Sequence, residues 1–164
     1  MDFVKRKQIR LQDFQYKKGC FFITICSNNR LPLFGDVYVG QGLCSCRLSE
    51  TGKIVKNELL NLPLRYPYII IRKYCVMPDH IHFIIDIIPK RREQSPRPTS
   101  CAEIICAYKS VTTKKANAID NKPGRKIWQS RYFDRSIRNI DEYNRICAYI
   151  DENPQKWKRD ELHY

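Results

Sequence analysis

A run near the middle of the chain alternates between apolar residues and two histidines, and it constrains the fold more than any other segment. Within Val76–Ile88, His80 and His82 are separated by one residue. Because side chains alternate faces along a strand, the two imidazoles project together, while Ile81 and Phe83 project to the other side. The run predicts a strand with one apolar face and one face that carries two potential metal ligands. A half-exposed sheet face without a ligand is the alternative.

Length and composition predict one cytoplasmic domain. The 164 residues are enough to bury a hydrophobic core and are most simply one domain, 1–164. No apolar run is long enough for a transmembrane helix, and the basic arm at residues 1–18 lacks the apolar stretch of a signal peptide. We expect the eight cysteines to be reduced, because most fall in apolar or amphipathic segments and Cys44 and Cys46 are closer in sequence than common zinc ligands.

Positive charge is concentrated in two parts of the chain. There are 30 Lys and Arg against 17 Asp and Glu, a net charge of +13. Residues 90–138 hold thirteen basic and four acidic residues, a net of +9, and residues 1–18 hold six and two, a net of +4. Such clustering predicts a polyanionic partner, most often nucleic acid, since neutralising phosphates releases counterions. A merely soluble basic surface is the alternative.

The first half of the chain predicts strand, helix and a strand pair. Gly19–Cys26 is short, aromatic and β-branched, which is typical of a buried strand. After a Gly-rich stretch with room for a short strand near residues 37–39, the apolar residues of 53–62 share one helical face, and Pro63 should end that helix. Residues 68–76 and 81–88 predict adjacent antiparallel strands.

The middle of the chain predicts a connector, a helix and an extended segment. Residues 89–99 are polar and proline-rich, and we expect them to be mobile. Ser100 and Glu103 match a capping box that opens an amphipathic helix. Residues 127–138 are basic and aromatic and predict a strand or an extended loop.

A last helix completes the predicted order of elements. Asn139 and Glu142 match its beginning, and Pro154 should end it at Asn153, because the residue before proline disfavours helical geometry. The order β, α, β, β, α, β, α with one tight strand pair predicts an α+β fold. We expect a ferredoxin-like antiparallel sheet with helices covering one side.

The last helix carries a potential nucleophile and a potential ligand. Tyr149 and Asn153 are four residues apart and therefore lie on one helical face. If that face meets His80 and His82, the side chains form a metal site beside a tyrosine able to attack a phosphate. Tyr143 competes for the nucleophile role, but it falls on the apolar stripe. In an arbitrary helix a lone tyrosine is more often a packing residue.

Five groups of residues carry a family resemblance over most of the chain. They are Lys18–Thr24, Tyr74–His82, Tyr108–Ser110, Ile127–Gln129 and Tyr149–Pro154. Taken together they resemble the HUH single-tyrosine transposases, and most closely the REP-associated tyrosine transposase branch. The resemblance implies an α+β fold of the HUH endonuclease type.

The resemblance also implies a function and a site. It implies a metal-dependent endonuclease and strand transferase that acts on single-stranded or hairpin DNA. In such proteins the histidine pair, here His80 and His82, binds Mg²⁺ or Mn²⁺, with Asn153 at the third-ligand position. The helical tyrosine, here Tyr149, forms a covalent 5′-phosphotyrosine link and releases a 3′-hydroxyl. A second such hydroxyl can attack this link and rejoin the DNA without ATP.

Two positions bear on how closely the chain follows the family pattern. The family usually has Asn before the first histidine, where this chain has Asp79, a change that could alter local hydrogen bonding but removes no ligand. Classical insertion-sequence members carry Gln at the third-ligand position, whereas Asn153 matches the REP-associated branch. Insertion-sequence members are dimers that exchange the tyrosine helix, and the REP-associated kind can work as monomers, so monomer and homodimer both stay open.

Six basic residues are the candidates for contacts with DNA phosphates. A solvated charged face is the alternative for each of them. The competing function is a non-catalytic nucleic-acid-binding module derived from a transposase, in which aromatic side chains such as Trp128 stack on bases. A replication initiator or plasmid relaxase is disfavoured, because those proteins usually carry larger or differently ordered domains. The six candidates are Lys109, Lys114, Lys115, Arg131, Arg135 and Arg138.

Overall fold

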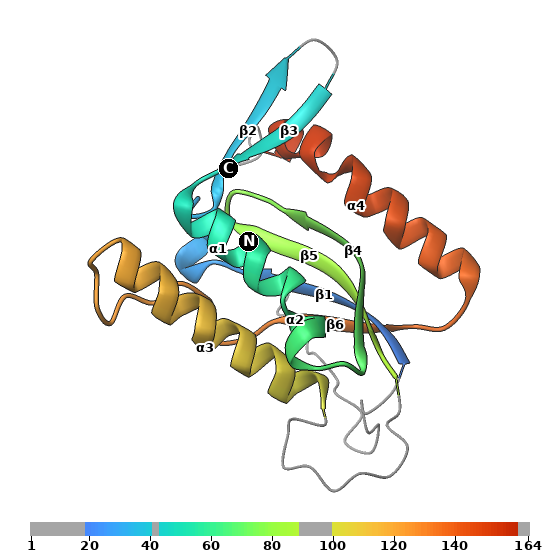
Figure 1. Cartoon of the computed structure of the whole chain (residues 1–164). Helices are drawn as coiled ribbons and strands as arrows, with labels where there is room; N and C mark the ends of the chain where they lie inside the picture. Colours follow the sequence, from blue (N-terminus) through green and yellow to red (C-terminus); the bar gives the residue numbers. More distant parts are fainter. Residues whose placement is uncertain (1–18, 41–42, 89–99, 161–164) are drawn as a thin grey trace, which may run out of the picture.

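An antiparallel four-stranded sheet is the central layer of the computed structural model, which describes residues 19–40, 43–88 and 100–160. Its strand order is β4-β5-β1-β6, so β5 and β1, which are distant in sequence, pair at its centre. A separate β2-β3 hairpin projects from the sheet (Figure 1). The strands are β1 (Gly19–Cys26), β2 (Gly35–Gly40), β3 (Leu43–Leu48), β4 (Ile69–Val76), β5 (His80–Ile87) and β6 (Phe133–Ile137).

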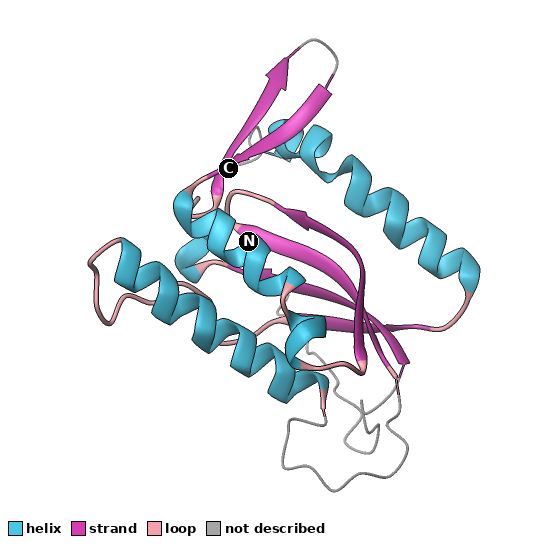
Figure 2. Cartoon of the chain, viewed as in Figure 1, coloured by secondary structure: helices cyan, strands magenta, loops and turns pink. Residues whose placement is uncertain are grey.

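Helices cover both faces of this sheet (Figure 2). Helices α1 and α3 lie on one face and α4 lies on the other. The α+β fold class with an antiparallel sheet is thus confirmed, but the expectation that helices cover one side only is wrong. The helices are α1 (Glu50–Leu60), α2 (Leu62–Arg65), α3 (Cys101–Ile119) and α4 (Ile140–Asp160), and a 3₁₀ turn, η1 (Asn28–Arg30), follows β1.

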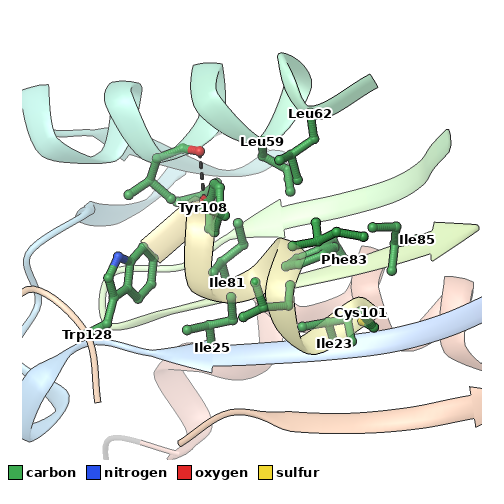
Figure 3. Packing of buried hydrophobic residues seen from close by; sticks show 14 of the residues in the cluster. Ile23, Ile25, Leu59, Leu62, Ile81, Phe83, Ile85, Cys101, Tyr108 and Trp128 are labelled. Atoms are coloured by element: carbon green, nitrogen blue, oxygen red, sulfur yellow. Dashed lines mark hydrogen bonds between the residues drawn. The ribbon is translucent and has the colours of Figure 1, made fainter. Parts of the chain in front are cut away.

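Strand β5 is buried on both faces, which fixes its register in the sheet. Ile81 and Phe83 belong to the main core, between the sheet and helices α1 and α3 (Figure 3). In this core the hydroxyl of Tyr108 donates to the backbone oxygen of Val55 at 2.8 Å, which satisfies a fully buried phenol. On the opposite face Ile84 packs in a smaller cluster with residues of β1 and α4.

The predicted beginnings of two helices are confirmed by their capping hydrogen bonds. In α3 the hydroxyl of Ser100 accepts from the backbone N–H of Glu103, and the Glu103 carboxylate accepts from the backbone N–H of Ser100. In α4 the side-chain oxygen of Asn139 accepts from the backbone N–H of Glu142 at 2.8 Å. These bonds satisfy backbone donors that a helix leaves free in its first turn.

Helix α1 begins at Glu50, earlier than the expected residue 53. The hydroxyl of Ser49 accepts from the backbone N–H of Gly52 at 3.0 Å and caps the helix. A Cβ atom at position 52 would lie 1.9 Å from the backbone oxygen of Phe34, so only glycine permits this close approach. Gly52 lies inside the helix, whereas the sequence interpretation placed it before the helix.

Neither Pro63 nor Pro154 ends a helix at the residue where the sequence predicted an end. Helix α1 ends at Leu60, and Pro63 lies in the first turn of the short helix α2, where its missing N–H has no intrahelical partner to lose. Helix α4 continues through Pro154 to Asp160, so the predicted end at Asn153 is wrong. The last turns of α4 follow the sheet toward β3, and these tertiary contacts override the local preference.

Two of the predicted segments fall outside the part of the chain that the structure describes. The basic arm at 1–18 and the connector at 89–99 lie outside the described residues, as does the side chain of Cys44. No helix among the described residues combines the length and the apolar character needed to span a bilayer. The cysteines whose side chains are described carry free thiols: Cys20, Cys26, Cys46, Cys75, Cys101, Cys106 and Cys147.

Candidate functional site

Strand β5 presents His80 and His82 on the sheet face that α4 covers. Their ring centroids are 4.5 Å apart, and the residues are only 6% and 4% exposed. His82 also stacks on Phe22 of β1, with centroids 5.4 Å apart and planes inclined by 23°. The two imidazoles therefore lie together in a buried layer, and not on a half-exposed sheet face.

Hydrogen bonds occupy one nitrogen of each imidazole. The Nδ1 atom of His80 is 2.6 Å from a carboxylate oxygen of Asp79, and the Nδ1 atom of His82 is 2.7 Å from the hydroxyl oxygen of Thr24. Partners of this kind fix the orientation of a metal-binding ring and leave Nε2 as its ligating atom. Thr24 is the register partner of His82 in the β1-β5 pair, so sheet pairing supplies this contact.

His82 is held in its neutral form. Burial lowers the pKa of its imidazole to about 3, and the nearby positive charges of His80 and Arg30 act in the same direction. The ring is therefore unprotonated at neutral pH. Neutral imidazole is the form that binds a metal ion.

Helix α4 places Tyr149 against this histidine pair. Its hydroxyl oxygen is 3.5 Å from Nε2 of His82, and the two ring centroids are 5.3 Å apart. The tyrosine remains 42% exposed, so solvent and a ligand can reach its phenol. Tyr143 lies in the smaller apolar cluster, where burial and a hydrogen bond with Cys147 raise its pKa. The tyrosine beside the histidines is thus Tyr149.

Asn153 lies one helical turn after Tyr149 and is 8% exposed. Its side-chain Nδ2 is buried and has no hydrogen-bond partner among the described residues. Since rotation of an amide exchanges its nitrogen and oxygen, the same position can present the oxygen that a hard cation prefers. One turn further, the ring of Trp157 lies 5.8 Å from that of His80.

His80, His82 and Asn153 fit a divalent cation by their donor chemistry. Two imidazoles with engaged Nδ1 atoms and one buried amide without a partner among the described residues form an incomplete ligand set. The described residues contain no group of three or more His, Cys, Asp or Glu side chains able to hold a metal ion. With the amide as a third protein ligand, further positions would remain for water or substrate oxygens.

Three of the six candidate phosphate-binding residues have partners within the protein. Lys109 donates to the backbone oxygens of Gln129 and Ser130, and burial lowers its pKa. Lys115 pairs with Glu58 at 2.5 Å, and Arg135 pairs with Glu142 at 2.5 Å. These contacts give the three residues a role in connecting elements. The other three, Lys114, Arg131 and Arg138, have exposed side chains.

A basic groove of about 790 Å³ lies between α3 and residues 121–130. We call it the α3 groove. Lys109, Lys114, Arg125 and Lys126 line it, and its lining residues include no carboxylate. It is on the sheet face opposite α4, yet Gln129 in its wall donates to the backbone oxygen of Cys26 at 3.0 Å. Because Cys26 is the register partner of His80, the groove ends close to the histidine strand.

The residues around the histidines include some that the sequence interpretation missed. Arg30 pairs with Asp79 at 2.8 Å and so reaches the surroundings of His80. Trp157 was missed because the helix was expected to end before it, although its spacing of four residues from Asn153 continues the same face. Thr24 carried no signal, because only strand pairing identifies the neighbour of His82.

Comparisons with known proteins identify a family for this chain. The family model described as "Transposase IS200 like" matches residues 65–153, more than half of the chain. An uncharacterised protein of Haemophilus influenzae (strain KW20/Rd) is 31% identical over 173 aligned residues, which cover 96% of this chain and 93% of the relative.

Two solved structures have a similar fold. One is a REP-associated tyrosine transposase bound to a REP hairpin, with a TM-score of 0.62 and 21% identity over 95% of this chain and 74% of that chain. The other is a protein of Deinococcus radiodurans R1 described as a transposase, with a TM-score of 0.50 and 15% identity over 84% of this chain and 91% of that chain. At these identities the likeness concerns the fold.

Proposed function

This chain belongs to the IS200-like transposase family, and we propose that it is a metal-dependent single-stranded DNA endonuclease and strand transferase that acts through Tyr149. The observation that carries the proposal is the approach of the Tyr149 hydroxyl to Nε2 of His82 at 3.5 Å. A phenol that is both accessible to a ligand and next to two buried imidazoles supports covalent catalysis on a phosphate.

The proposed metal ligands are His80, His82 and Asn153. They would hold Mg²⁺ or Mn²⁺, whose charge would offset that of the scissile phosphate and of the transition state. Asp79 and Thr24 orient the two imidazoles through their Nδ1 atoms. Apart from Asn153, which lies on α4, these residues occupy β5, its preceding turn and β1, so the rigid centre of the sheet carries most of the site.

The proposed reaction is a transesterification. The phenolic oxygen of Tyr149 attacks phosphorus, a new P–O bond forms, and the bond to the 3′-oxygen breaks. The phenol loses one proton and the departing 3′-oxygen gains one. The DNA is then joined to Tyr149 through its 5′-phosphate. Attack by a 3′-hydroxyl on this link reverses the step and joins DNA, and ATP is not needed because one phosphoester replaces another.

We propose single-stranded or hairpin DNA as the partner. The structurally similar REP-associated tyrosine transposase is bound to a REP hairpin. In this chain, the α3 groove offers two exposed lysines, Lys114 and Lys126, and no lining carboxylate, which suits a phosphate backbone. The backbone N–H of Gln129 joins the wall of this groove to Cys26, the register partner of His80.

The test is the formation of a covalent protein–DNA adduct. Labelled hairpin DNA pools with single-stranded flanks are incubated with the wild type, Tyr149→Phe and Tyr143→Phe, with Mn²⁺ or with EDTA, and are separated on denaturing gels. Tyr143→Phe is the matched control, because it removes a second hydroxyl from the same helix. We expect an adduct for the wild type and Tyr143→Phe with Mn²⁺, and none for Tyr149→Phe or in EDTA.

Two outcomes would contradict the proposal. An adduct that persists in Tyr149→Phe would assign the nucleophile to another residue. DNA binding without any adduct, across varied hairpins with Mn²⁺, would favour the non-catalytic binding module, for which Tyr149→Phe should change nothing.

A further inference from the structure

A chain of polar contacts connects the surface residue Arg30 to His80. Nε of Arg30 is 2.8 Å from one carboxylate oxygen of Asp79, and the other carboxylate oxygen is 2.6 Å from Nδ1 of His80. The Asp79 side chain is 6% exposed and that of Arg30 is 44% exposed. The carboxylate therefore lies between a half-exposed cation and a buried imidazole, and each of its oxygens has one of these partners.

The backbone around Arg30 is held in a conformation that side-chain-bearing residues seldom adopt. Asn29 and Arg30 have φ angles of +54° and +57°, two consecutive non-glycine residues in the left-handed region. Such strain persists only where surrounding contacts impose it, and it is concentrated at functional sites. The Arg30 side chain in this segment contacts Asp79, and a guanidinium nitrogen of Arg30 also donates to the sulfur of Cys26 at 2.9 Å.

Backbone hydrogen bonds fasten the two loops that carry this pair. The backbone N–H of Ser27 donates to the oxygen of Asp79 at 2.8 Å, and that of Phe34 donates to the oxygen of Pro78 at 2.9 Å. The segment 27–34, which carries Arg30, is thus attached at both of its ends to the turn before β5. These backbone bonds join the two segments independently of the side-chain pair.

The pair determines which imidazole nitrogen of His80 carries the proton. A carboxylate paired with a guanidinium acts only as an acceptor, so the Nδ1 atom of His80 must donate. The lone pair of the neutral ring is then on Nε2. We infer that Arg30 and Asp79 are positioning residues, which fix the tautomer and orientation of His80 for metal binding; this inference rests on the proposed function.

A second Arg–Asp pair, which joins β4 and β5, offers a matched control. Arg72 and Asp86 also join by Nε and a carboxylate oxygen, at 2.6 Å, with side-chain exposures of 46% and 19%. Asp86 lies on β5 like the histidines, but among the described contacts it has none with an imidazole. The variants are Asp79→Ala, Asp79→Asn and Arg30→Gln, with Asp86→Ala and Arg72→Gln as controls.

The first measurement is the tautomer of His80 in the metal-free protein, from long-range ¹H–¹⁵N NMR correlations. We expect the Nδ1–H form in the wild type and in both controls. Asp79→Ala should raise the population of the Nε2–H form. Asp79→Asn keeps an acceptor for Nδ1 but loses the ion pair, so it should retain the tautomer and resemble Arg30→Gln in metal affinity.

The second measurement is Mn²⁺ affinity, followed by the paramagnetic relaxation of water protons. Loss of an outer partner of a metal ligand costs about 10–100-fold in affinity, and we expect a loss of that order for Asp79→Ala. Arg30→Gln and Asp79→Asn should show a smaller loss. The control variants should bind Mn²⁺ as the wild type does.

The outcomes separate this inference from the proposed function. If His80 tautomer and Mn²⁺ affinity in all three variants equal those of the controls, and only the melting temperature falls, the pair is structural and the inference is wrong. If both change as expected but the wild type forms no DNA adduct, the positioning role stands and the proposed reaction fails. A wild type that binds no Mn²⁺ would overturn both.

Discussion

Buried polar residues define several structural roles at the scale of the single residue. Glu58 of α1 is 3% exposed, yet its carboxylate pairs with Arg65 and, at 2.5 Å, with Lys115 of α3. Burial raises the pKa of this carboxyl, but the hydrogen bonds from Lys115 and Arg65 outweigh burial and hold the pKa below its ordinary value of 4.5. The charged form of Glu58 is thus part of the contact between α1 and α3.

Glu58→Gln should lower the free energy of unfolding at pH 7 by about 2 kcal/mol, because it leaves two cations beside a neutral group. A carboxylate with a lowered pKa stabilises the fold fully above the ordinary value of 4.5, and this contribution is lost as the pH falls through the lowered value. The stability of the variant should therefore fall less steeply in that acid range. Urea titrations from pH 7 downward measure both effects.

Glu50→Gln is the control for this prediction. Its carboxylate also pairs with a lysine, Lys53, but both side chains are more than half exposed. Exposed pairs contribute little, so this variant should change stability by a few tenths of a kcal/mol at most. An equal effect of the two substitutions would show that burial of Glu58 is irrelevant.

At the scale of the element, α4 is a helix that continues through a proline. Pro154 has no N–H to donate to the backbone oxygen of Ile150, and its ring crowds the preceding turn. The helix nevertheless carries Tyr149 before the proline and Trp157 after it, and both rings lie next to the histidines. Lys73 of β4 also pairs with Asp151 at 2.6 Å, which ties this part of α4 to the sheet.

Pro154→Ala should raise the free energy of unfolding by about 1–3 kcal/mol, since it restores a helical hydrogen bond. Pro63→Ala is the matched control: Pro63 lies in the first turn of α2, where no intrahelical bond is missing, and its replacement should have little effect. Thermal unfolding compares the two. A lower melting temperature for Pro154→Ala would mean that contacts of the proline ring outweigh the missing hydrogen bond.

At the scale of the whole molecule, positive charge is divided between structural and free cations. Lys114 lines the α3 groove and is exposed, whereas its neighbour Lys115 is bound to Glu58. Only a cation that can meet phosphate releases a counterion when DNA binds. The net charge of +13 therefore overstates the number of contacts available to DNA.

Lys114→Gln should weaken the binding of single-stranded DNA and reduce the slope of log K against log salt by about 0.7, the value for one lost phosphate contact. Lys115→Gln removes the same charge one residue away but should leave the slope unchanged. Fluorescence anisotropy over a series of salt concentrations gives both slopes. Equal losses for the two variants would place the DNA elsewhere than in the α3 groove.

Local sequence patterns were sufficient to predict which residues share a face of a strand or helix and where a capped helix begins. Alternation along the strand predicted the shared face of His80 and His82, and helical spacing predicted that of Tyr149 and Asn153. The capping box at Ser100 followed from residue types alone. The end of α4 could not be predicted in this way. Proline inside a helix is locally unfavourable, and the contacts that α4 makes beyond Pro154 compensate for this cost only in the folded chain.

The sequence by itself determined the fold class, the strand that carries the histidines and the helix that carries the tyrosine. Only the tertiary structure decided that α4 covers the second face of the sheet, that Thr24, Arg30 and Asp79 surround the histidines, and that Lys109, Lys115 and Arg135 have partners within the protein. The physical reason is that periodicity acts over a few residues, whereas strand pairing and ion pairs join residues that the chain brings together only on folding.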